Sequence, residues 1–331
     1  MTQKLSLEGV RGLRLIAQLL ADSTALPRTT SQGSAVGVAK HMLAMQAQNR
    51  NASLEAIDIR SQAPGLAAKA LKNSLIIRSW SQRGTHQVLA AEDVRWMTRL
   101  CSPRIVAASE KRQTQLGLDP AASERAHDIL AEHAATALVP RSKAYELFAS
   151  VGVDPSEGRG QHLLRRFGGQ GDIVQGPPQG REDTFVLLDS VCPLSIALEG
   201  DAALEEMTLR YFRSRGAATA KDLQWWTGLT LAQVKRGIAV AEASKEIQPA
   251  EGPHTEAMWI PTYAADVTEN EITAALEKSL LLPTFDEYLL SYTGRHHVMD
   301  IAQHHTAIGP GKNGLFKPFR LVNGEALPRE I

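Results

Sequence analysis

Two amide side chains, Gln46 and Gln48, are separated by a single residue and follow the apolar segment 42–45. Amides cannot act as a general base at neutral pH, but a pair of them can hold a water molecule and direct dipoles at a developing positive charge. On an α-helix, residues i and i+2 point about 200° apart. Both amides therefore reach one pocket only at a fraying helix end or in an extended segment, and the polar run 49–51 favours a helix end. A helix C-cap network is the alternative interpretation of the pair.

Basic side chains gather in local groups, although the chain as a whole is neutral. Thirty-six Lys and Arg residues balance thirty-six Asp and Glu residues, so the molecule offers no net attraction to phosphate backbones. Any binding of nucleic acid must depend on the local groups, and each group can equally be a solvated helix face. The groups are Arg78 and Arg83; Arg95, Arg99 and Arg104; Arg165 and Arg166; Arg210, Arg213 and Arg215; and Lys235 and Arg236.

Residue types that bind metals are present in unpromising arrangements. The two cysteines form no CxxC pair, which argues against a zinc site and against a secreted disulfide scaffold. The histidines at 296–297 and at 304–305 would point about 100° apart on a helix, and no Cys or carboxylate follows them at zinc-finger spacing. Asp286 and Glu287 are also adjacent, which does not suit a paired acid and base. We expect no metal, no cofactor, and a structural role for these two carboxylates.

The length and hydropathy of the chain set broad limits. A chain of 331 residues is expected to form two or three domains. Its apolar runs stay below the roughly 18–20 residues of a membrane span, and the N-terminal sequence has no signal-peptide core. We therefore expect a soluble cytoplasmic protein.

The elements that would position these side chains are clearest in the third quarter of the chain. Helical spacing predicts an amphipathic helix that ends at Gly216 and contains Leu204, Met207, Tyr211 and Phe212. Two capping boxes predict the two helices that follow, Thr219 with Asp222 and Thr230 with Gln233. This order is typical of a helix-turn-helix, whose last helix would expose Gln233, Lys235 and Arg236. The tryptophans at 225–226 are expected to anchor the helices in the core.

A similar order recurs in the middle of the chain. Apolar spacing predicts helices over 126–137 and 161–167, with Ser142 as the N-cap of a helix between them. Strand-like runs follow at 172–175 and 184–188, across a turn-rich connection. Three helices and a hairpin are the parts of a winged helix.

The N-terminal part can be interpreted as a third copy. We expect helices over 7–20, 34–45 and 67–74, and a hairpin that pairs 76–80 with 85–89. The hairpin is polar, and four of its side chains could project into nucleic acid or face solvent: Arg78, Arg83, His86 and Gln87.

Three runs carry a resemblance to a known family: RSWSQRGT at 78–85, DLQWWTGLT at 222–230 and PTFDEY at 283–288. Over most of residues 5–324 the chain resembles the bacterial winged-helix DNA-binding family that includes the AlkZ-like and YcaQ-like DNA glycosylases. The resemblance implies an α+β, mainly α fold, with three tandem winged-helix units around a concave DNA-binding channel.

The three units would span residues 1–118, 119–198 and 199–331. We expect the C-terminal sheet of the last unit to be incomplete, because Pro328 stands where a returning strand would be needed.

Family glycosylases carry a Gln, an apolar residue and then Gln or Asp, and Gln46 and Gln48 stand at those positions. The resemblance implies metal-free, monofunctional excision of N7-alkylated purines, including the unhooking of interstrand crosslinks. Such a base is cationic and already a good leaving group, so two amides suffice to orient water or contact the deoxyribose. The residues expected to bind DNA are Arg78, Arg83, His86, Gln87, Arg165, Arg166, Gln233, Lys235 and Arg236. His86 stands one place earlier than the corresponding His of relatives.

We expect a monomer that binds alkylated double-stranded DNA and is associated with the nucleoid. One alternative is a winged-helix regulator without catalysis, which would more often dimerise on a palindromic site. The other is a scaffold whose winged helices bind protein, and salt-sensitive binding to random DNA would then be absent.

Overall fold

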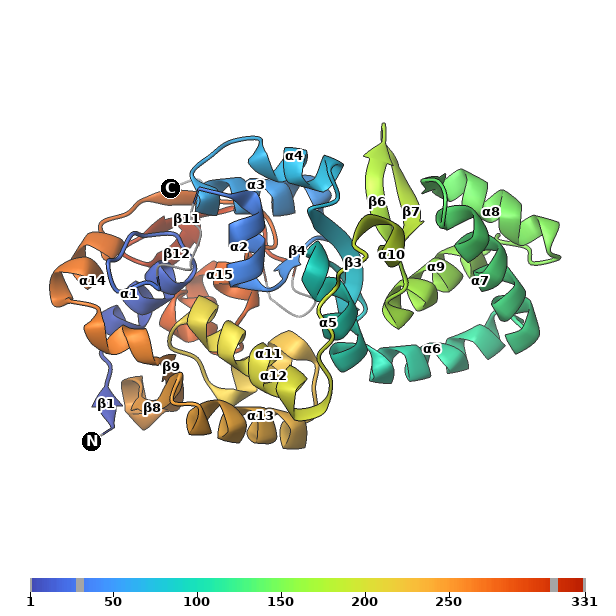
Figure 1. Ribbon diagram of the computed structural model, residues 1–331. Coiled ribbons are helices and arrows are strands. Elements are labelled where there is room, and N and C mark those ends of the chain that lie inside the picture. The colour runs from blue at the N-terminus through green and yellow to red at the C-terminus, as the bar shows by residue number, and fades with distance from the viewer. Residues whose placement is uncertain (1, 28–32, 310–314, 330–331) are drawn as a thin grey trace. The chain divides into compact units, whose positions relative to one another are not determined.

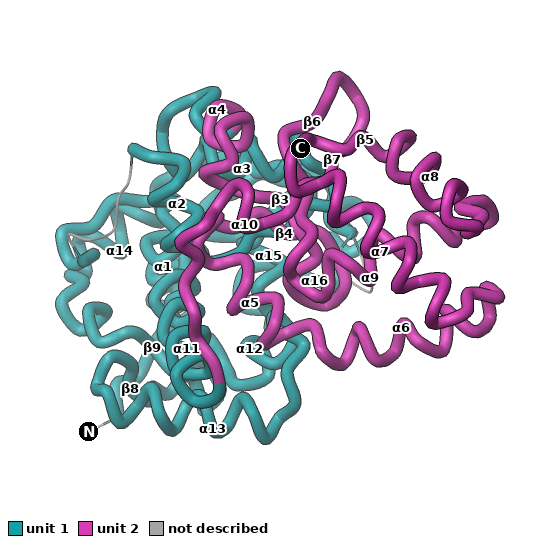
Figure 2. Tube along the Cα trace, turned by 45° about the vertical axis from the view of Figure 1, so that its right-hand side comes forward, with its two compact units in different colours: residues 1–67, 200–331 teal, residues 68–199 magenta. Residues whose placement is uncertain are grey.

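The computed structural model describes residues 2–27, 33–309 and 315–329 (Figure 1). The chain forms two compact units, which are coloured separately in Figure 2. Unit 1 contains residues 1–67 and 200–331, and unit 2 contains residues 68–199. Helices predominate over strands, so the predicted α+β, mainly α class is confirmed. Within the described ranges no helix is both long enough and apolar enough to cross a bilayer.

The N-terminal part of unit 1 provides three helices around a short extended segment. α1 (Leu7–Ala17) confirms the first predicted helix. α2 (Ala35–Met42) ends earlier than expected, and β2 (Met45–Gln46) follows it. α3 (Arg50–Ser61) was not expected, and α4 (Leu66–Lys72) leads into unit 2.

The helix-turn-helix region of unit 1 follows its predicted order, in α11 (Gly200–Arg215), α12 (Ala220–Thr227) and α13 (Leu231–Ala243). Both predicted capping boxes are present, at Thr219 and at Thr230. Gly216 ends α11 with a φ of +65°, and an added Cβ would lie 2.7 Å from the carbonyl oxygen of Leu13. The turn therefore requires glycine for both its conformation and its close approach to α1.

A hairpin follows the three helices. β8 (Ile247–Glu251) pairs with β9 (Ala257–Pro261), and β1 (Gln3–Lys4) adds a parallel edge strand, in the order β1-β8-β9. η2 (Pro253–Thr255) lies in the connection between β8 and β9, and η3 (Thr262–Asp266) follows β9.

The C-terminal part of unit 1 contains α14 (Glu269–Leu276), α15 (Glu287–Leu290), η4 (Arg295–His297) and α16 (Ile301–His304). Its sheet has the order β10-β11-β12, in β10 (Leu280–Leu282), β11 (Phe319–Val322) and β12 (Glu325–Pro328). The expectation of an incomplete sheet was wrong, because the returning strand forms and Pro328 pairs with Phe319 at its end. β12 is an edge strand, where a missing N–H group is tolerated.

Unit 2 is built on two antiparallel hairpins whose strands lie in the order β4-β3-β6-β7-β5. The first hairpin joins β3 (Ile76–Gln82) to β4 (Thr85–Ala90), and the second joins β6 (Ile173–Gln179) to β7 (Glu182–Leu187). β5 (Val139–Pro140) pairs with β7. Both hairpins confirm the strand predictions.

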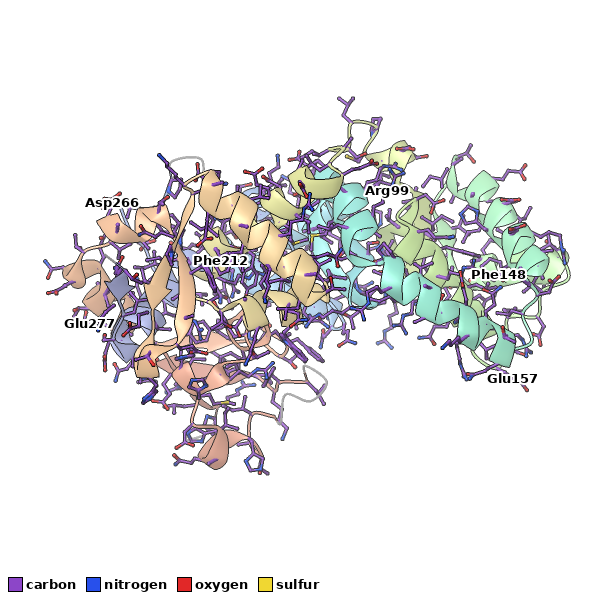
Figure 3. All side chains as sticks on the ribbon, turned by 90° about the horizontal axis from the view of Figure 1, so that it is seen from below. Arg99, Phe148, Glu157, Phe212, Asp266 and Glu277 are labelled. Atoms are coloured by element: carbon purple, nitrogen blue, oxygen red, sulfur yellow. The ribbon has the colours of Figure 1, made fainter. Side chains whose placement is uncertain are left out.

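The helices of unit 2 pack on this sheet around a core that includes Trp80, Phe148, Phe167 and Phe185. The helical elements of unit 2 are η1 (Ala91–Asp93), α5 (Val94–Cys101), α6 (Pro103–Gln115), α7 (Pro120–Ala134), α8 (Arg141–Ser150), α9 (Arg159–Gln170) and α10 (Leu188–Val191). Of these, α6 packs on α9 rather than on the sheet. Figure 3 labels Phe148 of this core and Phe212 of unit 1, both fully buried.

The predicted N-cap of α8 was wrong. Ser142 lies inside the helix, which begins directly after Pro140 without a side-chain cap. The backbone N–H of Ser142 is instead bound by the carboxylate of Glu182. Helices α7, α8 and α9 followed by the β6–β7 hairpin have the predicted order, and the number of winged-helix units stays a prediction.

Candidate functional site

Gln46 and Gln48 lie between α2 and α3 in extended chain rather than at a frayed helix end. Gln46 is the last residue of β2 and is buried, whereas Gln48 is exposed. The polar run after them begins a helix, because the Asn49 side chain accepts a hydrogen bond from the Ala52 N–H at 3.2 Å. The preference for a helix end was therefore wrong, and the extended alternative is the one that the protein adopts.

The backbone of the Gln46 segment is held by two buried charges. The Glu287 carboxylate accepts a hydrogen bond from the backbone N–H of Gln46 at 2.8 Å. The Arg215 guanidinium donates to the carbonyl oxygens of Met42 and Ala44 at 2.6 and 3.0 Å. Three backbone groups within five residues are therefore fixed by side chains from α11 and α15.

Arg215 and Glu287 also form an ion pair, with 3.2 Å between Nη2 and Oε2 and almost no exposure of either side chain. Glu287 accepts two further hydrogen bonds, from Trp226 Nε1 at 2.9 Å and from Ser291 Oγ at 2.6 Å. Burial lowers the pKa of Arg215 from its ordinary value, and the nearby Glu287 opposes this shift. The pair is stable in the interior because its charges are matched and hydrogen-bonded.

A second buried ion pair, between Arg60 and Asp286, joins α3 to the start of α15. Arg60 of α3 donates to both carboxylate oxygens of Asp286 at 2.8 Å, and a third bond at 2.9 Å joins Arg60 to Gln18. Asp286 also caps α15 by accepting the N–H of Tyr288 at 2.8 Å. The adjacent Asp286 and Glu287 thus bind two parts of one stretch of chain, Glu287 at β2 and Asp286 at α3.

Three of the residues expected to bind DNA lie in the first hairpin of unit 2. Their side chains contact other side chains of the same unit. Arg78 is buried and pairs with Asp183 at 3.3 Å. His86 Nδ1 lies 3.1 Å from Arg78 Nη2, and burial, followed by Arg78, lowers the pKa of His86 to about 2. Gln87 is buried and donates to Thr85 Oγ1 at 3.0 Å. His86 is therefore neutral at physiological pH and cannot attract a phosphate by its charge.

The turn of this hairpin meets an arginine from α9. Arg83 and Gly84 both have positive φ, at 51° and 64°, as a two-residue hairpin turn requires. The exposed Arg165 lies so close to Gly84 that an added Cβ would overlap its guanidinium. Arg166, by contrast, donates to the side chain of Gln113 on α6. The structure thus places Arg165 beside the hairpin turn at Gly84 and directs Arg166 toward α6.

The three candidates on α13 of unit 1 differ in availability. Gln233 serves the capping box, where its Oε1 accepts the Thr230 N–H at 3.0 Å. Arg236 is exposed and forms a double contact with Asp201 of α11, with 2.6 Å for the Nη2 bond. Lys235 is exposed on the same helix.

Sequence reasoning missed the role of Arg215, which it assigned to a basic surface group. The signal was present, because Arg215 follows Met207 and Tyr211 on the apolar stripe of α11, where a charge needs a buried partner. The expected structural role of Asp286 and Glu287 agrees with their buried contacts, but their distant partners had no local signal.

Two comparisons relate the chain to known proteins. The family model described as DNA glycosylase AlkZ-like matches residues 39–327. The solved structure of Streptomyces sahachiroi DNA glycosylase AlkZ is similar with a TM-score of 0.76 and 19% identity, and the match covers 98% of this chain and 87% of that chain. A comparison with curated protein sequences finds no match. Since the family model spans most of the chain, including Gln46 and Gln48, the chain belongs to the AlkZ-like DNA glycosylase family.

Proposed function

We propose that the protein hydrolyses the N-glycosidic bond of N7-alkylated purines in duplex DNA, with Gln46 and Gln48 as the catalytic amides. Membership of the family establishes a DNA repair glycosylase that binds DNA. The observation that carries the finer proposal is the buried clamp of Arg215 and Glu287 on the backbone beside Gln46. A clamp of this kind suits a site where small errors in side-chain position slow the reaction.

The proposed reaction does not require general-acid catalysis by the protein. An N7-alkylated purine is cationic and leaves without further protonation, so the barrier lies in forming the cationic sugar and placing water. Amide oxygens directed at the sugar stabilise its positive charge, and an amide can also hold the attacking water. Gln46 and Gln48 supply these groups, while Glu287 and Arg215 act as positioning residues.

The exposure of Gln48 supports the inference that the enzyme accepts bulky substrates. Gln46 is buried and Gln48 is exposed, so the motif extends from the interior to the solvent. A base that remains attached to a large adduct or to the opposite strand cannot enter an enclosed pocket. We therefore include the unhooking of interstrand crosslinks in the proposal.

DNA would be bound by basic side chains, with the exposed Arg165 and Lys235 and the half-buried Arg83 as the leading candidates. Arg78, His86 and Gln87 would shape the first hairpin from within, because they contact neighbouring side chains of unit 2. Arg166, Gln233 and Arg236 would contribute after exchanging the partners that they have in the free protein.

The test is base release from a duplex with a single N7-methylguanine, followed by alkaline cleavage of the abasic site. The parent should release the base and leave the strand intact until alkali is added, as expected for a monofunctional enzyme. Gln46→Ala and Gln48→Ala should lose activity while binding DNA with parental affinity. Gln303→Ala removes an exposed amide elsewhere in unit 1 and should behave as the parent.

Two outcomes would contradict the proposal. Equal rates for the parent and both Gln variants would mean that the pair is not catalytic. DNA binding without base release from any alkylated or crosslinked duplex would favour a regulator.

A further inference from the structure

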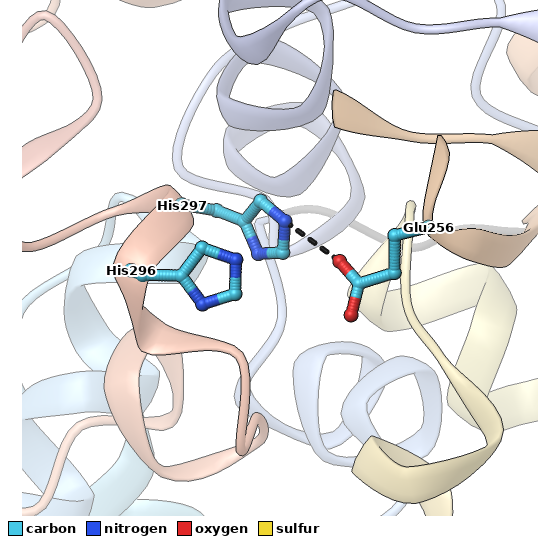
Figure 4. A group of neighbouring side chains, drawn as sticks. All are labelled: Glu256, His296 and His297. Atoms are coloured by element: carbon cyan, nitrogen blue, oxygen red, sulfur yellow. Dashed lines mark ion pairs between the residues drawn. The ribbon is translucent and has the colours of Figure 1, made fainter. Parts of the chain in front are cut away.

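A group of three potential metal ligands lies in unit 1 (Figure 4). It consists of Glu256, His296 and His297, each of which offers one ligand atom, and these atoms all lie within 4.8 Å of one another. Glu256 follows η2 in the connection between β8 and β9, and the two histidines belong to η4. Two segments that are distant in sequence therefore supply the group.

His297 is oriented by its own turn. Its Nδ1 lies 2.7 Å from the carbonyl oxygen of Gly294, which can only accept a hydrogen bond. The proton is thereby placed on Nδ1, and a lone pair is left on Nε2. This arrangement, in which a backbone carbonyl orients the imidazole, is common around protein-bound metals.

The Nε2 atom of His297 faces a second atom that accepts rather than donates. Glu256 Oε2 lies 2.9 Å away, and both atoms are shielded from solvent. Neither atom has a hydrogen bond of acceptable geometry within the described parts of the chain. Two electron-pair donors held this close need a proton or a metal ion between them.

His296 provides the third potential ligand, on the side of the group that faces solvent. Its ring centroid lies 4.0 Å from that of His297, with 38° between the ring planes. The two rings lie together within η4, a single 3-10 turn. His296 is exposed, so water can complete the coordination.

We propose that Glu256, His296 and His297 bind one divalent transition-metal ion of the Zn²⁺ class. Two imidazole nitrogens and one carboxylate oxygen suit Zn²⁺ and related ions, and a water molecule would fill the fourth position. The ion would fasten the β8–β9 connection to η4. Arg11 of α1 holds η4 from another side, because its Nε donates to the carbonyl oxygen of His297 at 2.7 Å. The proposal is independent of base excision.

The experiment uses the full-length protein without an affinity tag and stripped of metal by chelation. Titration with Zn²⁺ in a calorimeter should give one saturable site, and Zn²⁺ should raise the unfolding temperature. Co²⁺ should give the visible absorption of a four-coordinate site, saturating at one equivalent. Glu256→Gln and His296→Ala, both on accessible side chains, should abolish the tight site, and His305→Ala, in another neighbouring histidine pair, should retain it.

Each other result would overturn the assignment. The absence of saturable binding would show that a proton rather than a metal ion joins His297 and Glu256. Equal binding by the parent, Glu256→Gln and His296→Ala, or loss of binding in His305→Ala as well, would show that surface histidines collect the ion without a built site. Folding of the variants is checked by circular dichroism before titration.

Discussion

The two regions expected to serve chemistry and DNA contact use their buried charges differently. In unit 1, Arg215 and Glu287 bind backbone groups around Gln46. In unit 2, the buried Arg78 binds neighbouring side chains instead, namely Gln175, Asp183 and His86. Buried charges that bind the backbone position a neighbouring side chain and leave its polar atoms available to a ligand. Charges that hold one another occupy the side chains themselves, so a ligand has to compete with the network.

The largest effect is expected from breaking the clamp in unit 1. Glu287→Ala or Arg215→Ala leaves a buried charge without its counter-ion, which typically lowers the free energy of unfolding by about 3–5 kcal/mol. Urea denaturation at neutral pH measures the loss. The double variant Arg215→Met with Glu287→Leu removes both charges and should be more stable than either single variant. Parental urea midpoints for both single variants would show that the pair does not hold the segment.

The next effect concerns the reaction rather than the fold. Gln48→Leu should raise the barrier to base release by about 2–4 kcal/mol, because an oriented dipole is lost. The free energy of unfolding should change by no more than about 1 kcal/mol, because the side chain is exposed. Gln48→Asp keeps an oxygen that can hold water and stabilise a cationic sugar, so it should retain part of the activity. Single-turnover base release compares the variants, and equal rates for Leu and Asp would remove Gln48 from the mechanism.

Local patterns were sufficient to predict most elements near these sites. The capping boxes at Thr219 and Thr230 and the hairpin from Ile76 to Ala90 depend on neighbours within a few residues, so their residue types determine them directly. Helix α3 was missed because its apolar residues are few and its N-cap Asn49 resembled the end of the preceding helix.

The clamp itself could not be predicted from local pattern. Arg215 and Glu287 are far apart in sequence, as are Arg60 and Asp286, and each pair meets only when the helices pack. The Glu256 and His297 contact has the same origin. A buried charge in an apolar stripe indicates that a partner exists, but chain folding decides which residue it is.

The hairpin network of unit 2 predicts a dependence of stability on pH. The pKa of His86 is lowered to about 2, so the unfolded chain binds more protons below pH 6.5. The contribution of His86 to the free energy of unfolding is therefore constant above pH 6.5. Below pH 6.5 this contribution falls by about 1.4 kcal/mol per pH unit. Between pH 7 and pH 5 the contribution is about 2 kcal/mol.

Urea unfolding of the parent and of His86→Gln at both pH values isolates this contribution. The half-buried His41 and the buried His297, whose pKa values are each lowered to about 4, contribute equally to both proteins and cancel in the difference. The variant should lose about 2 kcal/mol less than the parent on acidification. An identical loss in the two proteins would mean that His86 is protonated in the folded hairpin and available to a phosphate.

The smallest effect is expected in the salt dependence of DNA binding. It distinguishes two basic side chains of one helix, of which one forms an ion pair. Lys235 and Arg236 are both exposed on α13, but Arg236 pairs with Asp201, and this pair lowers the pKa of that carboxyl. Each phosphate contact contributes about 0.9 to the slope of log affinity against log salt concentration. Lys235→Ala should therefore reduce the slope for undamaged duplex by about 0.9, and Arg236→Ala should reduce it by less. Asp201→Asn should steepen the slope, because it releases Arg236 to the DNA. Fluorescence anisotropy over a range of salt concentrations measures all three, and a slope unchanged in every variant would exclude α13 from the DNA-binding surface.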